Sequence, residues 1–105
     1  MAAILRDWSV VATDYVIREV LEEFALIAYK QKPRYYFGET LCYLQGTIFN
    51  DSRFQNGKII GTSCVQSIFK CGNSLIATTQ TGSKYILPID SIQAGLSEAL
   101  PRLLD

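Results

Sequence analysis

The chain has 105 residues, with ten basic and ten acidic side chains, no histidine and three cysteines. This length suits one domain, since domains usually contain roughly 100–200 residues. Hydrophobic residues make up 49% of the chain and charged residues 19%, which excludes a disordered protein and favours a folded one with a buried core. The absence of histidine removes the commonest general base and the commonest zinc ligand. We therefore expect no enzymatic activity, no metal and no cofactor.

We expect no targeting signal in this sequence. Two glutamates interrupt its most apolar stretch, residues 20–29, which is far shorter than the ~20 apolar residues that span a bilayer. Residues 1–12 lack the basic start and the long apolar run of a signal peptide. Cys42, Cys64 and Cys71 are odd in number and form no C-x-x-C pair, which favours buried, reduced thiols and leaves their reactivity open. We expect a cytoplasmic protein.

The clearest predicted element is a helix over residues 14–29. Apolar residues recur there at spacings of three and four, which places them along one side of a helix. They are Ile17, Val20, Leu21, Phe24, Ile27 and Ala28. Thr13 or Asp14 can cap the first turn, and Pro33 ends the helix. Trp8 and its valine neighbours precede the helix, either as a short strand or as a staple against it.

Residues 34–88 are predicted to form strands, because β-branched and aromatic residues dominate between turns rich in glycine and asparagine. The expected strands are residues 41–49, 58–69, 75–80 and 84–87. Asn56 and Gly57 are the strongest turn signal among them. A short or broken helix is expected over residues 90–104, since Gly95 and Pro101 weaken it.

These elements predict a single α+β domain over residues 1–105. It has a helical layer at 1–32, a β module at 34–88 and a C-terminal helix at 90–104. The expected architecture is a curved antiparallel sheet, or a small SH3-like half-barrel, of four or five strands. The N-terminal amphipathic helix is expected to pack on this sheet. Its apolar residues are predicted to meet Ile48, Val65, Ile68, Ile76 and Ile86.

The balanced total charge hides an uneven distribution along the chain. The net charge is −3 over residues 1–29, +5 over residues 30–84 and −2 over residues 85–105. A basic β module beside aromatic residues is typical of surfaces that follow a phosphate backbone. The residues of this nucleic-acid hypothesis are Lys30, Lys32, Arg34, Tyr35, Tyr36, Lys58 and Lys84. The alternative is that these are solvated lysines and core tyrosines.

The acidic face of the predicted helix supports a different hypothesis, in which it binds a basic surface on another protein. Its residues are Asp14, Arg18, Glu19, Glu22 and Glu23. The alternatives are a solvated face without a partner and self-association, so the oligomeric state is left open. Another carboxylate, Asp51, could pair with Glu39, but its place in a turn favours an Asx hydrogen bond to its own backbone.

Residues 46–57, 60–65 and 81–87 resemble small proteins of phages and prophages. Those proteins carry the pattern G-x-V-x-N-D-x-R-F-x-D-G-x-x-I-x-T-S, followed by a final S-x-Y-x-L strand. This chain departs from it at Asn56, where the pattern has aspartate, and at Ile48, where it often has valine. The resemblance implies that Arg53 hydrogen-bonds backbone carbonyls across a loop. It also implies that Phe54 closes the end of a barrel.

The resemblance also implies a cellular context. Small phage-encoded proteins without catalytic residues often act by occupying the surface of a host protein, and anti-CRISPR proteins are the best-known class of this kind. The expected function is therefore non-enzymatic inhibition of a host defence component, by stoichiometric protein–protein binding in the bacterial cytoplasm. The alternatives are a nucleic-acid-binding module that uses the basic β region and a toxin-immunity protein.

Overall fold

The computed structural model describes residues 3–12, 14–29, 34–36 and 42–91, without the side chains of residues 14–17, 25, 29, 34–36 and 91. The elements are, in chain order, β1 (Ala3–Ala12), α1 (Asp14–Tyr29), β2 (Arg34–Tyr36), β3 (Cys42–Phe49), β4 (Lys58–Gly61), β5 (Val65–Cys71), β6 (Ser74–Thr79), β7 (Lys84–Pro88) and the short 3-10 helix η1 (Ile89–Ser91). Within these residues, no helix has the length and apolar character needed to cross a membrane.

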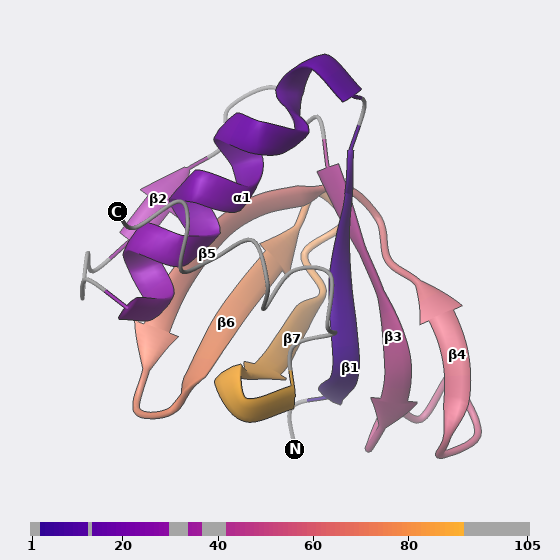
Figure 1. Ribbon diagram of the computed structural model, residues 1–105. Coiled ribbons are helices and arrows are strands. Elements are labelled where there is room, and N and C mark those ends of the chain that lie inside the picture. Colours follow the sequence, from indigo (N-terminus) through magenta and orange to yellow (C-terminus); the bar gives the residue numbers. More distant parts are fainter. Residues whose placement is uncertain (1–2, 13, 30–33, 37–41, 92–105) are drawn as a thin grey trace.

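The strands form one seven-stranded sheet in the order β2-β5-β6-β7-β1-β3-β4 (Figure 1). Neighbouring strands are antiparallel, except that β1 and β7 are parallel. The parallel pair joins two antiparallel groups, β2-β5-β6-β7 on one side and β1-β3-β4 on the other. The sheet is therefore mixed, and its N-terminal strand lies near the middle.

The short connection between β4 and β5 shows how strongly the sheet curls. In a flat sheet, five strand spacings would separate these two strands by about 24 Å. The chain from the end of β4 to the start of β5 reaches at most about 14 Å. On one side of this connection the amide of Thr62 donates to the carbonyl of Leu44 at 2.8 Å, and on the other the amide of Gln80 donates to the carbonyl of Cys64 at 2.9 Å. The two halves of the sheet therefore approach each other at residues 62–64.

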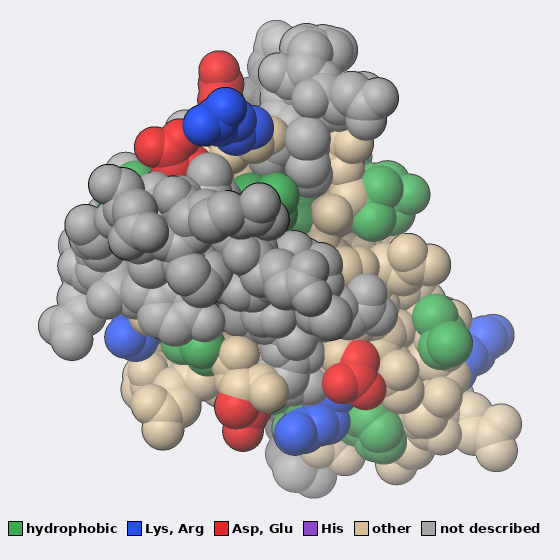
Figure 2. Space-filling view, viewed as in Figure 1, with side chains coloured by type: hydrophobic (Ala, Val, Ile, Leu, Met, Phe, Trp, Pro, Cys, Tyr) green, Lys and Arg blue, Asp and Glu red, His purple; other side chains and the backbone are tan. Residues whose placement is uncertain are grey.

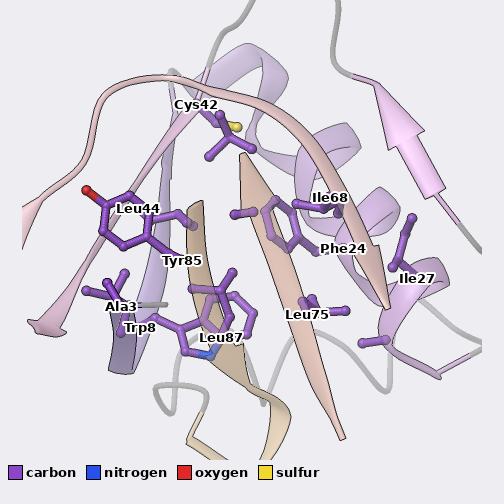
Figure 3. Packing of buried hydrophobic residues seen from close by; sticks show 14 of the residues in the cluster. Ala3, Trp8, Phe24, Ile27, Cys42, Leu44, Ile68, Leu75, Tyr85 and Leu87 are labelled. Carbon is purple, nitrogen blue, oxygen red and sulfur yellow. The ribbon is translucent and has the colours of Figure 1, made fainter. Parts of the chain in front are cut away.

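The core lies between α1 and the face of the sheet that the helix covers (Figures 1 and 3). Phe24 and Ile27 of the helix are buried there together with Leu75 of β6. Trp8 of β1 is also fully buried, and its ring centroid is 5.8 Å from that of Phe24. Its Nε1 donates to the carbonyl of Pro88 at 2.8 Å. Trp8 therefore connects α1, β1 and the end of β7 in one core.

A β-bulge in β1 allows Trp8 to enter this core. The register of β1 against β3 shifts between Arg6 and Ser9, so β1 has one extra residue there. Asp7, inside the bulge, has a φ of 50°, a conformation that aspartate tolerates better than most residues. On β3, a Cβ added to Gly46 would lie 2.8 Å from the carbonyl oxygen of Arg6. Glycine at this position therefore leaves the space that the bulge occupies.

Several parts of the sequence-based fold are wrong. The sheet is mixed and has seven strands, not four or five antiparallel ones. The helix keeps its predicted bounds but is not N-terminal, because residues 3–12 of the supposed helical layer form β1. The predicted strand 58–69 is two strands, since the chain bends at residues 62–64 and changes its partners. The predicted helix 90–104 lies almost wholly outside the described residues.

The predicted core contacts are only partly correct. The residues that are buried as expected are Val20, Phe24, Ile27, Ile48, Val65 and Ile68. Ile76 and Ile86 are only half-buried, because Leu75 and Leu87 occupy the core positions next to them. Successive strand residues face opposite sides of a sheet, so an error of one position moves the whole set to the other face.

Candidate functional site

The hairpin of β3 and β4 carries the features that point to function. Its loop, residues 50–57, is held by its own hydrogen bonds. The side-chain oxygen of Asn56 accepts from the amide of Asn50 at 2.9 Å, and the amide of Gly57 donates back to the end of β3 at 2.8 Å. Asn50 and Gly57 have φ values of 63° and 89°, a region that asparagine and glycine tolerate. The loop therefore has a fixed conformation at the end of the hairpin.

Arg53 links this loop to the core. Its Nε and Nη2 donate to the two carboxylate oxygens of Asp51 at 3.0 and 2.8 Å, and Nη2 also donates to the Tyr85 hydroxyl at 3.0 Å. The Arg53 amide donates to Oδ1 of Asp51 at 3.0 Å, which confirms the predicted Asx hydrogen bond. The side-chain bond from Arg53 holds the pKa of Asp51 below its ordinary value. The resemblance implies that Arg53 bonds to backbone carbonyls, but its guanidinium bonds to Asp51 and Tyr85 instead. The charge of Arg53 is paired with the Asp51 carboxylate.

Asp51→Asn is expected to lower the free energy of unfolding at neutral pH by about 1 kcal/mol or less, because solvent screens the ion pair at Arg53, whose side chain is 55% exposed, although that of Asp51 is only 8% exposed. Asparagine keeps an oxygen that can accept from the Arg53 amide but loses the charge and the second acceptor, so the substitution removes the ion pair and keeps the Asx hydrogen bond. The folded protein depresses this pKa, so the stabilisation exists above the unfolded value of ~3.9 and is lost as the pH falls through the folded value. Urea denaturation at pH ~7 and pH ~2 checks this. A difference of equal size at both pH values would contradict it.

Phe54, which the resemblance implies to close the end of a barrel, packs against the edge of the core. Its ring is half-buried and packs against the core cluster. The guanidinium carbon of Arg53 is 5.4 Å from the ring centroid and the ammonium of Lys58 is 5.8 Å from it, both within the ~6 Å range of cation–π contacts. Lys58 is thereby held at the start of β4, with its charge exposed to solvent.

Among the described strands, β4 lies at an edge of the sheet and carries an exposed apolar side chain. It is the last strand in the order, and Figure 2 shows hydrophobic and basic side chains close together over it. Ile60 faces the core, so Ile59 faces outward and is 69% exposed. Tyr43 of β3 is 40% exposed on the same outer face, with ring atoms 3.7 Å from the position a Cβ of Gly61 would take. We call Tyr43, Ile59 and Gly61 the edge patch.

The backbone of the edge patch offers hydrogen-bonding groups to a partner. Residues of antiparallel strands alternate between bonding to their partner strand and pointing away from it. Thr62 bonds to β3, since its amide donates to the carbonyl of Leu44. By this alternation the N–H and C=O groups of Gly61 and Ile59 point away from β3. The edge patch therefore presents both apolar side chains and backbone groups.

The three cysteines differ in their environments. Cys42 is buried, Cys64 is half-buried and Cys71 is exposed, and all are free thiols. Burial raises the pKa of the Cys42 thiol to about 12, and neighbouring Cys64 adds to the shift. Cys42 is therefore protonated at neutral pH and packs as a small apolar residue. Among the described residues, no three His, Cys, Asp or Glu side chains are grouped to hold a metal.

The acidic helix face contains a basic residue as well. Arg18, Glu19 and Glu22 are exposed on α1 and Glu23 is half-buried, while the side chain of Asp14 lies outside the described part. In Figure 2 a basic side chain lies among the acidic ones over this helix. The face therefore has mixed charge and lacks a uniform acidic field.

The proposed nucleic-acid residues do not form one described surface. Lys30 and Lys32 lie outside the described residues, and so do the side chains of Arg34, Tyr35 and Tyr36, whose backbone pairs with β5 as β2. Lys58 begins β4 and Lys84 begins β7, and both are exposed. Two strands, β1 and β3, lie between them in the sheet. The two lysines thus occupy separate places.

The sequence reasoning missed the edge patch, although a signal for it was present. Ile59 and Ile60 are consecutive in a strand, so they face opposite sides, and one of them is exposed unless both faces are covered. The edge position of β4 depends on the pairing of distant strands.

Comparisons with protein-family models, with curated proteins and with solved structures found no match to this chain.

Proposed function

We propose that the protein acts by stoichiometric, non-enzymatic binding of another protein at the edge patch. An extended segment of the partner adds to β4 and continues the sheet, as in other strand-addition complexes. The observation that carries this proposal is Ile59, a large apolar side chain that is 69% exposed on the last described strand, on the same outer face as Tyr43. Burying such a side chain fully contributes about 1.5–3 kcal/mol. The outward backbone groups of Ile59 and Gly61 then bond to the added strand.

The chemistry around the edge patch defines the partner segment. Proteins protect open edges with short strands and lysines, and β4 has both, since it spans four residues and begins with Lys58. A segment that pairs with β4 needs an apolar side chain facing Ile59 and an acidic side chain near Lys58. The charge of Lys58 thus favours a partner segment with an acidic side chain and opposes uncontrolled growth of the sheet.

The proposed partner is a component of bacterial host defence, bound in the host cytoplasm in the manner of anti-CRISPR proteins. Support for this context comes from the resemblance of residues 46–57 to small phage proteins. The hairpin that carries the resemblance also carries the edge patch. A toxin-immunity protein would use the same kind of binding and differs in the identity of its partner.

The test captures the partner from a bacterial lysate with the tagged chain, and then measures the affinity of the purified partner by calorimetry. Ile59→Asp is expected to weaken binding at least about 30-fold, since central apolar contacts contribute ~2 kcal/mol or more. Gln66→Asp is the matched control, because it adds the same charge at an exposed position of β5. Hydrogen exchange should slow at β4 in the complex. Equal affinities of Ile59→Asp and wild type would refute binding at the edge patch.

Two further variants separate the other hypotheses. If Glu19→Lys with Glu22→Lys abolishes binding and Ile59→Asp does not, α1 is the binding surface and the edge patch is not. If the chain instead binds DNA or RNA, retention should fall steeply with salt and decrease in Lys58→Gln with Lys84→Gln. Either result, binding through α1 or binding of DNA or RNA, would be inconsistent with strand addition.

A further inference from the structure

The outer face of the sheet, opposite the face that α1 covers, carries a row of large apolar side chains. Ile4 of β1 pairs with Phe49 of β3 on one side and with Ile86 of β7 on the other. Ile86 pairs in turn with Ile76 of β6. Paired residues of neighbouring strands point to the same face of a sheet, so these four side chains lie next to one another. We call Phe49, Ile4, Ile86 and Ile76 the outer row.

The burial of adjacent residues fixes the direction of the outer row. Ile76 lies between the buried Leu75 and Ala77, and each of the other three residues also has a fully buried neighbour in its strand. Since successive strand residues face opposite sides, the whole row points away from the core. The four side chains are half-buried. They shield one another but do not protrude, so covering them requires a surface of matching shape.

The middle of the sheet is therefore apolar on both faces. This pattern is typical of sheets that are covered on both sides, and so is the parallel pairing of β1 with β7. Within the described residues, α1 is the only α-helix and packs on the core side (Figure 1), so no described helix covers the outer row.

Two cations flank the outer row, one on each side. Arg6 lies two positions after Ile4 in β1, and Lys84 lies two positions before Ile86 in β7, so both are on the outer face. Because β1 and β7 are parallel, the two positions lie on opposite sides of the row, each about 7 Å from it along its strand. Both side chains are exposed. Asp7, in the bulge, is the single acidic residue of the described strands and is engaged in another contact.

These charges decide between the possible partners. A second copy of this chain would bring the same two cations to the contact, and like charges oppose association. A partner with carboxylates on both sides of an apolar surface is attracted instead. The charge therefore favours a different, acidic protein over self-association.

The dimensions of the outer row match those of an amphipathic helix. The row crosses three strand spacings, about 14 Å, which corresponds to about two and a half helical turns of 5.4 Å. A helix with its side chains has a radius of about 5–6 Å, so its flanks lie close to cations about 7 Å from the row. The apolar stripe of such a helix then faces the row while both of its edges face a positive charge.

We propose that the outer row binds an amphipathic α-helix of a partner protein, whose apolar stripe has acidic residues on both sides. The apolar side chains of that helix cover the outer row, and its carboxylates pair with Arg6 and Lys84. The other face already packs a helix in this way, since Phe24 and Ile27 of α1 are buried against it. This surface is separate from the edge patch, which binds an extended segment, and neither site depends on the other.

The experiment titrates the full chain, labelled at its isoleucine methyl groups, with two synthetic helical peptides about four turns long. Both peptides have the same leucine stripe, flanked by glutamates in one and by lysines in the other. The glutamate peptide should shift the methyl signals of Ile4, Ile76 and Ile86 and bind at least about tenfold more tightly than the lysine peptide. The methyl signals of Ile68 in the core and of Ile59 in the edge patch should not shift.

Ile76→Thr combined with Ile86→Thr should weaken binding of the glutamate peptide at least about tenfold, because threonine keeps the branched shape and removes apolar contact. Ile59→Thr is the matched control, since it makes the same change in the edge patch, and should bind the peptide as the wild type does. Each variant is first shown to keep the melting temperature of the wild type. Arg6→Gln with Lys84→Gln leaves the row intact and should remove the preference for the glutamate peptide.

Several results would overturn this proposal. Equal binding of the two peptides, or no methyl shift at millimolar peptide, would show that the outer row does not select an acidic helix. A shift of Ile59 without Ile4 would place the peptide at the edge patch. Contacts of the row's methyl groups with residues 92–105 in the free chain would show that the chain itself covers the row. Methyl shifts that depend on protein concentration without peptide would show that a second copy does.

Discussion

Trp8→Ala is expected to lower the free energy of unfolding by about 3–5 kcal/mol, the usual cost of deleting a buried tryptophan. The side chain is fully buried, contacts the ring of Phe24 and donates a hydrogen bond to Pro88. Its removal leaves a cavity between α1 and the sheet and an unsatisfied carbonyl at the end of β7. A domain of this size has a stability of roughly 5–15 kcal/mol, so this variant is expected to be partly unfolded at 37 °C.

Urea denaturation followed by far-UV circular dichroism measures this effect, because Trp8 is the single tryptophan and its fluorescence is lost in the variant. Trp8→Phe is the matched control. It keeps an aromatic ring in the core and removes the hydrogen bond, so we expect a clearly smaller loss than for alanine. A loss under about 1 kcal/mol for Trp8→Ala would contradict the role assigned to this residue.

Gly46→Ala is expected to be the second most damaging of these substitutions, with a loss of about 1–3 kcal/mol from overpacking. The added Cβ would lie 2.8 Å from the carbonyl oxygen of Arg6 and 3.1 Å from the Cα of Trp8. Both are backbone atoms of the bulge, so the strand itself has to move. The same movement would displace Trp8 from the core.

Gly61→Ala provides a matched control for Gly46→Ala in the next strand. Its added Cβ would make an ordinary contact of 3.7 Å with the ring of Tyr43, and Gly61 has no positive φ. We expect a change within about 0.5 kcal/mol, as for most exposed positions. Thermal unfolding of the two variants compares them directly. A similar drop in melting temperature for both would show that the bulge is not what requires glycine at position 46.

These two positions also decide which variants can test function. Trp8 and Gly46 hold the frame on which the edge patch is built, so their variants are expected to impair binding through loss of folding. Ile59, Arg6 and Lys84 are exposed, and changes at exposed positions are usually close to neutral for stability. Binding experiments should therefore use the exposed positions, with folding variants as negative controls.

The predictions from the sequence succeeded where the signal is local. The helix over residues 14–29 follows from the spacing of its apolar residues, and the turn at Asn56 and Gly57 follows from their backbone preferences. The Asx hydrogen bond of Asp51 connects residues only two positions apart. Interactions of this range depend on neighbours in the chain, which the sequence displays directly.

The predictions failed where distant segments decide the structure. The parallel pairing of β1 with β7 joins residues about 80 positions apart, and no local pattern indicates it. In β6 and β7, consecutive residues are apolar, so the sequence pattern does not show which side chains face the core. Ile76 and Ile86 therefore could not be told apart from Leu75 and Leu87 as core residues. The edge patch was missed for the same reason, since it depends on the strand order.

By itself, the sequence indicated one amphipathic helix over residues 14–29, a β module over residues 34–88 and the turn at Asn56 and Gly57. It also limited the chemistry, because a chain without histidine lacks the commonest catalytic base. Only the tertiary structure decided that β1 lies near the middle of the described sheet and that β4 lies at its edge. The physical reason is that strand pairing is made by backbone groups common to all residues. The choice of partners therefore rests on burial summed over the whole fold.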